Sequence, residues 1–438
     1  MNRIVEKDKT LLVNGPASVM LVSGRAEVFG AAMNTAGKVV IREGKRLPFA
    51  VRETASLDIS LGENATAEEV DGDTIPPSWT TSCGELMKIA ARPVVALVLG
   101  TVDSGKSSFC TYLANKALIE KRKVVVLDGD LGQSDIGPPC TVAYSPVAKP
   151  ITDLFNLQAK NAVFVGDTSP SRVTVGVTEG LVALKNESLA RTPDIIIVNT
   201  DGWTEGDSAV SYKLELVRAL EPHVVFCIQQ KDELAPIYSA LGDTRKILVE
   251  SPVTVRQRDM QKRKNLRELG YVKYLRGSKV QSLSLSWVKV EGGQLFGLCK
   301  KRMSAKQASR IYSLLGMKPL HVAELDGRIH VIIGRRRWID GDNIKKVEEF
   351  TKKKVVVTRK GEEEGVFVGL YNNERNFLGV GVLQEIDYLR NTMKVNTPVS
   401  GEIGMLRMGN VKLDRNMREL PIAADENTAD FASFRKLF

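Results

Sequence analysis

The chain has 438 residues, enough for two or three domains that each bury a core of their own. Its formal net charge of +10 is typical of proteins that bind phosphate backbones, although a generally basic solvated surface gives the same balance. The five scattered cysteines include no C-x-x-C pair, which argues against a zinc site and against a disulfide framework. The first residues are too charged for a signal peptide and no apolar run approaches the ~20 residues that span a bilayer, so we expect a cytoplasmic protein without a membrane segment.

Residues 1–80 are predicted to form an N-terminal β domain. Short apolar runs such as residues 18–22 and 38–41 are separated by glycines, a pattern typical of a small all-β fold. The segment Pro76-Pro77-Ser78-Trp79 is interpreted as a linker, because adjacent prolines usually interrupt regular structure.

A phosphate-binding loop follows the apolar run at residues 94–99. The motif G-x-x-x-x-G-K-[ST] is complete, and the residues after it carry apolar side chains at helical spacing, so the strand, loop and helix that such a site needs are all predicted. Lys106 is expected to contact the β and γ phosphates, and Ser107 to bind Mg²⁺. The predicted nucleotide-binding residues, which we expect to hold ATP, are Gly100, Thr101, Val102, Asp103, Ser104, Gly105, Lys106, Ser107 and Ser108.

Two acids follow the next apolar run, at residues 124–127. Asp128 and Asp130 would lie at the carboxyl end of a buried strand beside the phosphate loop, where such folds hold Mg²⁺. One acid can serve the metal while the other accepts a proton from an attacking hydroxyl, or one can simply cap the following turn. We predict that Asp130 is the general base and that Asp128 belongs to the metal shell.

The rest of the central region alternates strands with helices. Apolar runs at residues 194–198, 223–228 and 246–249, with a helical stretch at 206–220, predict an α/β fold in which residues 81–278 form a P-loop NTPase domain with a doubly wound, mostly parallel sheet. Residues 279–438 are predicted to form a C-terminal β-rich domain. Helices are expected there at residues 304–315 and 341–352.

Three further motifs, Asp130-Leu131-Gly132-Gln133, residues 166–170 and residues 198–203, complete an ordered set that resembles the polynucleotide 5′-hydroxyl kinase family. That family includes the RNA kinase subunit of the eukaryotic mRNA 3′-cleavage factor, ribosomal-RNA-processing relatives and archaeal kinases. The resemblance implies transfer of the γ-phosphate of ATP to the 5′-hydroxyl of RNA, with single-stranded DNA as a further candidate substrate.

The resemblance also implies substrate contacts. Gln133, Thr168 and Ser169 are expected to contact substrate or phosphate, and Trp203 to stack on the terminal base of the RNA. A lone tryptophan packed under a loop is the alternative for Trp203. Family members often carry histidine where this chain has Asp167, so no catalytic role is assigned to Asp167.

The most basic helical run, residues 255–270, is similar to the arginine-bearing lid of the same family. A guanidinium that a lid brings over the migrating phosphoryl group stabilises its developing charge. Arg258 and Arg263 are the predicted catalytic arginines, with Arg256 and Arg267 as substitutes if the register differs. A solvated basic helix that only attracts RNA is the alternative.

Three other functions are alternatives. An ordinary GTPase is disfavoured because residues 199–202 do not match N-K-x-D, and a partitioning-type ATPase because Thr101 and Val102 stand where its second lysine would be. The third alternative is an ATP-binding scaffold subunit of an RNA-processing complex, with partner proteins and little or no kinase activity.

Overall fold

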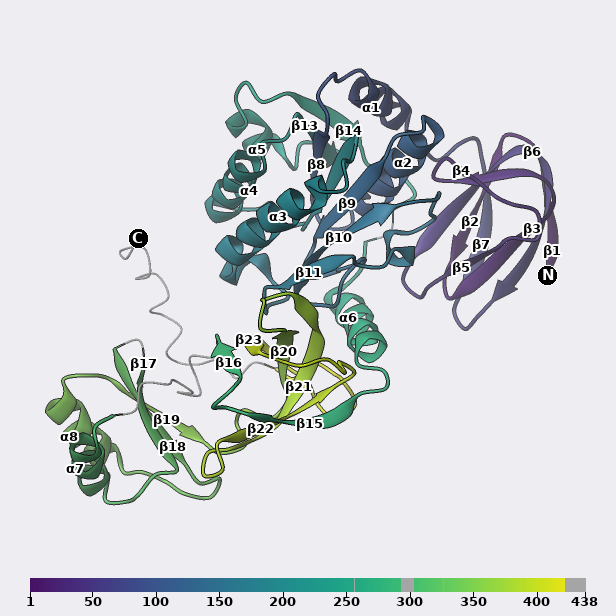
Figure 1. Cartoon of the computed structure of the whole chain (residues 1–438). Coiled ribbons are helices and arrows are strands. Elements are labelled where there is room, and N and C mark those ends of the chain that lie inside the picture. Colours follow the sequence, from purple (N-terminus) through teal and green to yellow (C-terminus); the bar gives the residue numbers. More distant parts are fainter. Residues whose placement is uncertain (256, 293–302, 326, 422–438) are drawn as a thin grey trace. The chain divides into compact units, whose positions relative to one another are not determined.

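The computed structural model describes residues 1–255, 257–292, 303–325 and 327–421 (Figure 1). It divides into two compact units, Met1–Tyr271 and Val272–Phe438. The N-terminal and central regions, which we predicted as separate domains, therefore share one unit. Among the residues described, none of the helices has the length and apolar character needed to cross a membrane.

A seven-stranded antiparallel sheet opens the first unit. Its central strands run in the order β4-β3-β6-β2-β7, with β1 paired to β6 and β5 to β3. Buried and partly exposed residues alternate along the start of β3, so one face of the sheet covers a core. The strands are β1 Asn2–Val5, β2 Lys9–Asn14, β3 Ala17–Val28, β4 Ala31–Ala32, β5 Lys38–Ile41, β6 Arg46–Leu61 and β7 Thr66–Asp71.

The predicted linker is wrong, because helix α1 (Pro77–Met87) begins inside it. Pro76 is the N-cap and Pro77 the first helical residue, a position that needs no backbone N–H and suits the fixed φ of proline. Trp79 is fully buried, and its Nε1 donates to the backbone carbonyl of Glu250 at 2.9 Å. The segment thus packs into the core of the unit.

The α/β sheet has the order β11-β10-β9-β12-β8-β13-β14, and its five strands from β9 to β14 in that order are parallel. Its elements are β8 Val94–Gly100, α2 Lys106–Ile119, β9 Val124–Gly129, β10 Thr141–Val147, the 3₁₀ helix η1 Leu154–Asn156, β11 Asn161–Phe164, η2 Pro170–Arg172, α3 Thr174–Leu189, β12 Ile195–Thr200, α4 Asp207–Leu220, β13 Val224–Gln229, α5 Ala235–Ala240, β14 Lys246–Glu250 and α6 Met260–Tyr274. This confirms the predicted α/β fold class.

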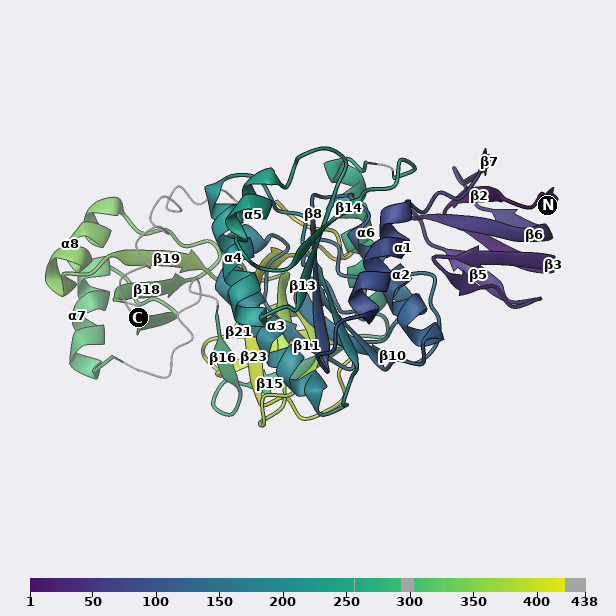
Figure 2. The same cartoon turned by 90° about the horizontal axis from the view of Figure 1, so that it is seen from above.

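Helices cover both faces of this sheet (Figure 2). On one face, α1 and α2 pack aromatic side chains against β13, with ring centroids 5.1 Å apart for Trp79 and Phe109 and 5.3 Å apart for Phe109 and Phe226. On the other face, leucines of α3 and α4, including Leu181 and Leu216, form the main core cluster. Because these strands are parallel, their carboxyl ends lie at the same edge of the sheet, where ligands bind in such folds.

Helix α6, the predicted lid, begins later and ends later than the predicted 255–270. The carboxylate of Asp259 accepts a hydrogen bond from the backbone N–H of Lys262 at 2.7 Å, a capping contact that sets the start of the helix. Gly270 does not end the helix. A β-carbon there would lie 2.9 Å from Pro139, so glycine allows the helix to approach that loop closely.

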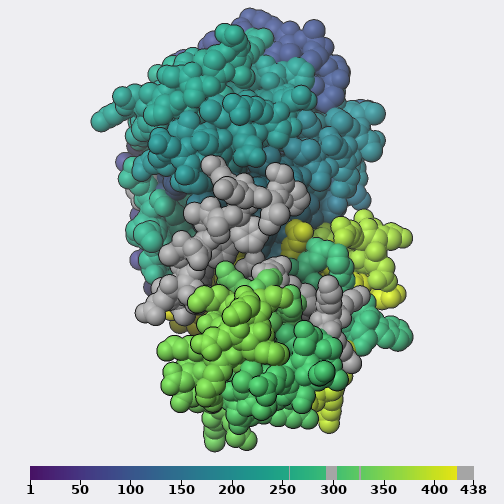
Figure 3. All heavy atoms as spheres, turned by 90° about the vertical axis from the view of Figure 1, so that its left-hand side faces the viewer, coloured from purple at the N-terminus to yellow at the C-terminus, as the bar shows by residue number. Residues whose placement is uncertain are grey.

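The second unit contains a six-stranded sheet, β15-β22-β21-β20-β23-β16, and a three-stranded sheet, β17-β18-β19. Its elements are β15 Lys279–Ser284, β16 Lys289–Glu291, α7 Ala305–Leu315, β17 His321–Leu325, β18 Arg328–Ile333, α8 Gly341–Thr351, β19 Val355–Arg359, β20 Val366–Tyr371, β21 Phe377–Asp387, β22 Thr392–Thr397 and β23 Met405–Lys412. Helices α7 and α8 confirm the two helices predicted here. The large green mass at the bottom of Figure 3 contains these helices and the smaller sheet.

Candidate active site

The phosphate loop, residues 100–107, joins β8 to α2. Gly105 has a φ of 97°, which favours glycine, and a β-carbon at Gly100 would lie 2.4 Å from Oγ of Ser104. Lys106 is buried, which lowers its pKa, and its Nζ donates to the carbonyl of Thr101 at 2.6 Å. The buried hydroxyl of Ser104 has no hydrogen-bond partner among the described residues, which leaves it available to a ligand.

Two neighbouring segments reach the same loop. A β-carbon at Gly202 would lie 2.6 Å from the backbone nitrogen of Val102, so the loop after β12 packs directly on the phosphate loop. Ser107 and Ser108 are half-buried in the first turn of α2. The Oγ of Ser107 lies 3.5 Å from Nζ of Lys45, which comes from the N-terminal sheet.

Asp128 is fully buried at the end of β9. Its Oδ1 accepts from the backbone N–H of Asp130 at 3.3 Å and from Nδ2 of Asn199 at 3.0 Å, and its Oδ2 accepts from the backbone N–H groups of Asp135 at 2.7 Å and Ile136 at 3.1 Å. Burial, reinforced by the charges of Asp135 and Asp130, raises the pKa of Asp128 to about 7. Both oxygens are thus engaged by protein donors. The contacts make Asp128 an anchor for the following loop, and its metal role stays a prediction.

Asp130 begins that loop, residues 130–136, which we call the acid loop. Its Oδ1 accepts from the backbone N–H groups of Gly132 and Gln133, each at 3.0 Å, so this acid does cap the turn. Its Oδ2 has no hydrogen-bond partner among the described residues. Burial raises the pKa of Asp130, while the nearby charge of Lys106 acts in the opposite direction. A half-buried carboxylate with one free oxygen beside a phosphate-binding lysine has the chemistry of a general base.

Both predicted lid arginines contact the phosphate loop through Asp103. The backbone N–H of Arg258 donates to Oδ2 of Asp103 at 2.8 Å, and its Nη1 lies 3.5 Å from Oδ1. The Nη2 of Arg263 donates to Oδ2 at 3.2 Å, while its buried Nε has no partner in the described part of the chain. Arg256 lies outside the described residues, and Arg267 lies in α6.

Gln133 ties the acid loop to the lid. Its Nε2 donates to the carbonyls of Gly132 at 2.7 Å and of Arg263 at 3.1 Å. A β-carbon at Gly132 would lie 3.3 Å from the carbonyl of Thr168, so the motif at residues 166–170 lies beside the acid loop. The Oγ of Ser169 lies 2.8 Å from Oγ of Ser171. The structure therefore gathers Gln133 and Thr168 near Asp130, and their substrate contacts stay predictions.

Trp203 is half-buried above a buried ion pair. Its ring stacks on Tyr212 with centroids 5.8 Å apart, and its backbone N–H donates to Oδ1 of Asp201 at 2.9 Å. The hydroxyl of Tyr212 donates to Oδ2 of Asp201 at 2.9 Å, and the fully buried Lys213 places Nζ 2.8 Å from Oδ1. One side of the indole is therefore packed on Tyr212 while the residue stays partly exposed, and both the stacking role and the alternative remain predictions.

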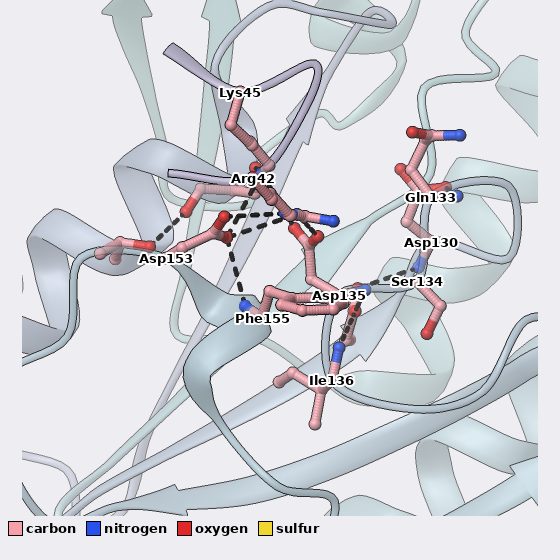
Figure 4. Close-up of polar contacts among 12 residues, drawn as sticks. Arg42, Lys45, Asp130, Gln133, Ser134, Asp135, Ile136, Asp153 and Phe155 are labelled. Atoms are coloured by element: carbon pink, nitrogen blue, oxygen red, sulfur yellow. Dashed lines mark hydrogen bonds and ion pairs between the residues drawn. The ribbon is translucent and has the colours of Figure 1, made fainter. Parts of the chain in front are cut away.

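Sequence reasoning missed several charged groups of the site. The burial of Lys213 was predictable from the sequence, because Lys213 lies four residues after Ala209 on the apolar face of α4. Arg42 and Lys45 gave no signal, because they lie in a turn of the N-terminal sheet, far along the chain from the acids that they contact (Figure 4).

Residues 100–277 match the model of one protein family, described as the P-loop of the mRNA cleavage and polyadenylation factor CLP1. This segment of the chain is therefore similar to that family. The match covers the phosphate loop, the acid loop and the lid, and it confirms the resemblance inferred from the motifs between residues 130 and 203.

Curated proteins similar to this chain include the polyribonucleotide 5′-hydroxyl-kinases of Methanocaldococcus jannaschii and Pyrococcus furiosus. The first is 25% identical over 339 residues and the second 29% identical over 334 residues. Each match covers 76% of this chain and 91% of the relative.

A solved complex of Clp1p with Pcf11p has the same fold. It matches with a TM-score of 0.65 and 12% identity, over 94% of this chain and 97% of the solved chain.

Proposed function

We propose that the protein is an ATP-dependent polynucleotide 5′-hydroxyl kinase that transfers the γ-phosphate of ATP to the 5′-hydroxyl of RNA. The observation that carries the proposal is the contact of Arg258 and Arg263 with Asp103, which brings two guanidinium groups to the phosphate loop. Gln133 joins the same lid to the acid loop that carries Asp130. The archaeal relatives whose matches cover 76% of this chain are named for this activity.

Each residue then has one task in the transfer. Asp130 accepts the proton of the 5′-hydroxyl while the hydroxyl oxygen attacks the γ-phosphorus of ATP. The bond from that phosphorus to the β,γ-bridging oxygen breaks, so that ADP leaves. Lys106 binds the β and γ phosphates. Arg258 and Arg263 stabilise charge on the migrating phosphoryl group. The raised pKa of Asp130 suits this task, because a general base works best when its pKa lies near the operating pH.

Mg²⁺ fits the donors at this edge of the sheet, since hydroxyl and carboxylate oxygens are the ligands it prefers. Ser107 would hold the ion, with Asp128 as the acid that we predicted for its shell. Bound Mg²⁺ would neutralise charge on the β and γ phosphates of ATP.

The substrate end is proposed to lie between the acid loop and the loop after β12. Gln133, Thr168 and Ser169 contact its sugar or phosphate groups, and Trp203 stacks on the terminal base. Single-stranded DNA is a further candidate substrate. We place the activity in the cytoplasm, in RNA processing or repair, with RNA-processing proteins as candidate partners.

Incubation with γ-labelled ATP, Mg²⁺ and 5′-hydroxyl RNA tests the proposal. Label is expected on the RNA, and none on a control RNA of the same sequence that already carries a 5′-phosphate. Lys106→Ala is expected to weaken both ATP binding and transfer. ATP binding without transfer by the wild-type protein would contradict the kinase and favour the scaffold alternative.

A further inference from the structure

The turn between β5 and β6, residues 42–45, carries two cations from the N-terminal sheet into the active site (Figure 4). Arg42 pairs with Asp135 of the acid loop, and its Nε donates to Oδ2 of Asp153 at 3.0 Å. Lys45 places Nζ 3.3 Å from Asp135 and 3.4 Å from Asp153. The guanidinium of Arg42 also lies 4.3 Å from the ring centre of Phe155. Two cations thus hold two acids from separate segments of the α/β region.

The turn presents Arg42 on a fixed backbone. The N–H of Lys45 donates to the carbonyl of Arg42 at 3.2 Å, and the N–H of Gly15 donates to the carbonyl of Lys45 at 2.9 Å. A β-carbon at Gly15 would lie 2.0 Å from the carbonyl oxygen of Arg42, so only glycine permits this approach. The position of the guanidinium is therefore set by the N-terminal sheet.

The acid loop depends on Asp135 in two ways. Its backbone N–H donates to Asp128, and its side chain, 6% exposed, forms ion pairs with Arg42 and Lys45. Without Arg42, Asp135 and Asp153 would share one lysine inside the protein, which is costly for two buried carboxylates. Although burial alone would raise it, Lys45 and Arg42 hold the pKa of Asp153 below its ordinary value.

The same turn meets the lid. A β-carbon at Gly44 would lie 3.0 Å from the side chain of Leu266 in α6, and Nη1 of the next residue after the turn, Arg46, donates to the carbonyl of Thr254 at 3.2 Å. The N-terminal sheet is therefore in contact with both segments that carry the proposed catalytic groups.

We propose that Arg42 is a positioning residue for phosphoryl transfer: by holding Asp135, it fixes the acid loop so that Asp130 meets the 5′-hydroxyl in the reactive geometry. The inference rests on the proposed kinase function and assigns the N-terminal sheet a part in it. Small misplacements of a reacting group can cost on the order of 10²-fold in rate, which makes such a support measurable.

Arg42→Met tests the proposal, with Arg52→Met as the matched control. Arg52 lies in the same sheet and pairs with Asp73 at 2.7 Å and Glu27 at 3.4 Å, away from the acid loop. Arg42→Met is expected to speed backbone hydrogen exchange at residues 132–136 and to lower kcat by about 10- to 100-fold, with the KM for ATP changed less than about threefold. Arg42→Lys should recover part of kcat, and Arg52→Met should change neither property.

Hydrogen exchange keeps this test separate from the kinase assay, because it needs no turnover. Unchanged exchange in Arg42→Met would overturn the proposal, and so would faster exchange with normal kcat or the same two effects in Arg52→Met. If Arg42→Met does not fold, Asp135→Asn provides the second variant, and the same loss of kcat with retained ATP binding is expected. A wild-type protein that transfers no label contradicts the proposed function itself.

Discussion

Oδ2 of Asp103 lies 3.2 Å from Nη2 of Arg263, and Oδ1 of the same carboxylate lies 3.5 Å from Nη1 of Arg258. An acid in the phosphate loop therefore holds both lid arginines at the loop that would bind the ATP phosphates. Asp103 has a φ of 57°, so its side chain is offered from an unusual backbone conformation that aspartate tolerates better than most residues. This arrangement holds two guanidinium groups at the phosphate loop, as the proposed transfer requires.

Arg258→Ala and Arg263→Ala are expected to lower kcat and kcat/KM together, by about 10³-fold, because a cation that acts as charge develops contributes to the transition state more than to ground-state binding. Steady-state kinetics with saturating ATP measures both constants. Lys262→Ala is the matched control, since Lys262 lies in the same helix and its exposed side chain pairs only weakly with Asp259, at 3.5 Å. A rise in KM alone in both arginine variants would reduce the lid to an electrostatic tether.

Asp130→Asn is expected to retain ATP binding and to lose about 10²- to 10⁴-fold in transfer, the usual range for a general base. Because burial raises the pKa of Asp130, activity of the wild-type protein should fall on the acid side at a pH above the ordinary aspartate value of 3.8. The base is protonated below its pKa, so activity is lost as the pH falls through it. A pH profile of kcat/KM checks this, and an acid limb at or below that ordinary value would contradict the assignment.

Much of the local structure could be predicted from the sequence. The apolar run and the glycine-lysine motif placed β8, the phosphate loop and α2, and the apolar stripe of residues 206–220 predicted α4, which begins one residue later, at Asp207. These elements follow from spacing within a few residues. The prolines at 76 and 77 led to the wrong prediction of a linker, because proline both interrupts regular structure and occurs in the first turn of helices. The burial of Trp79, which the sequence does not show, favours the helix.

The charged contacts of the site could not be predicted in the same way. Arg42 and Asp135 are 93 positions apart, and Asp103 and Arg263 are 160 apart. Charge order along the chain does not say which acid meets which base, because that depends on how the sheets and the lid pack. Three of the four hydrogen bonds to Asp128 come from backbone N–H groups of the acid loop, and they form only when that loop folds back toward β9, so the spacing of the acids along the chain could not predict them.

Asp128 is expected to make stability depend on pH. Its folded pKa of about 7 exceeds the value near 3.9 in an unfolded chain, so its contribution to stability is fully present below about pH 4 and is lost as the pH rises through 7. The Tm of the wild-type protein should therefore fall, relative to that of Asp128→Asn, between about pH 4 and about pH 7. Thermal unfolding of both proteins in the same buffers tests this, and parallel Tm curves would contradict it.

Trp203→Ala is expected to weaken RNA binding by ~1–3 kcal/mol at every salt concentration, with ATP binding near normal, because stacking on a base is mostly uncharged. Tyr212 supports the indole from below and leaves part of it exposed, which is the geometry of a stacking platform. Trp287→Ala is the matched control, since Trp287 is 86% exposed in the second unit.

Salt dependence separates the stacking contact from the phosphate contacts. A kinase acting on a terminal hydroxyl needs to grip only about 3 or 4 phosphates, and each neutralised phosphate of a single strand contributes about −0.7 to the slope of log affinity against log salt. We therefore expect a slope of roughly −2 to −3 for the wild-type protein and the same slope for Trp203→Ala, because the lost contact carries no net charge. Fluorescence anisotropy with labelled RNA over a series of salt concentrations gives both numbers. If RNA affinity is unchanged, or if the variant loses its fold, Trp203 is a core residue and the stacking model is wrong.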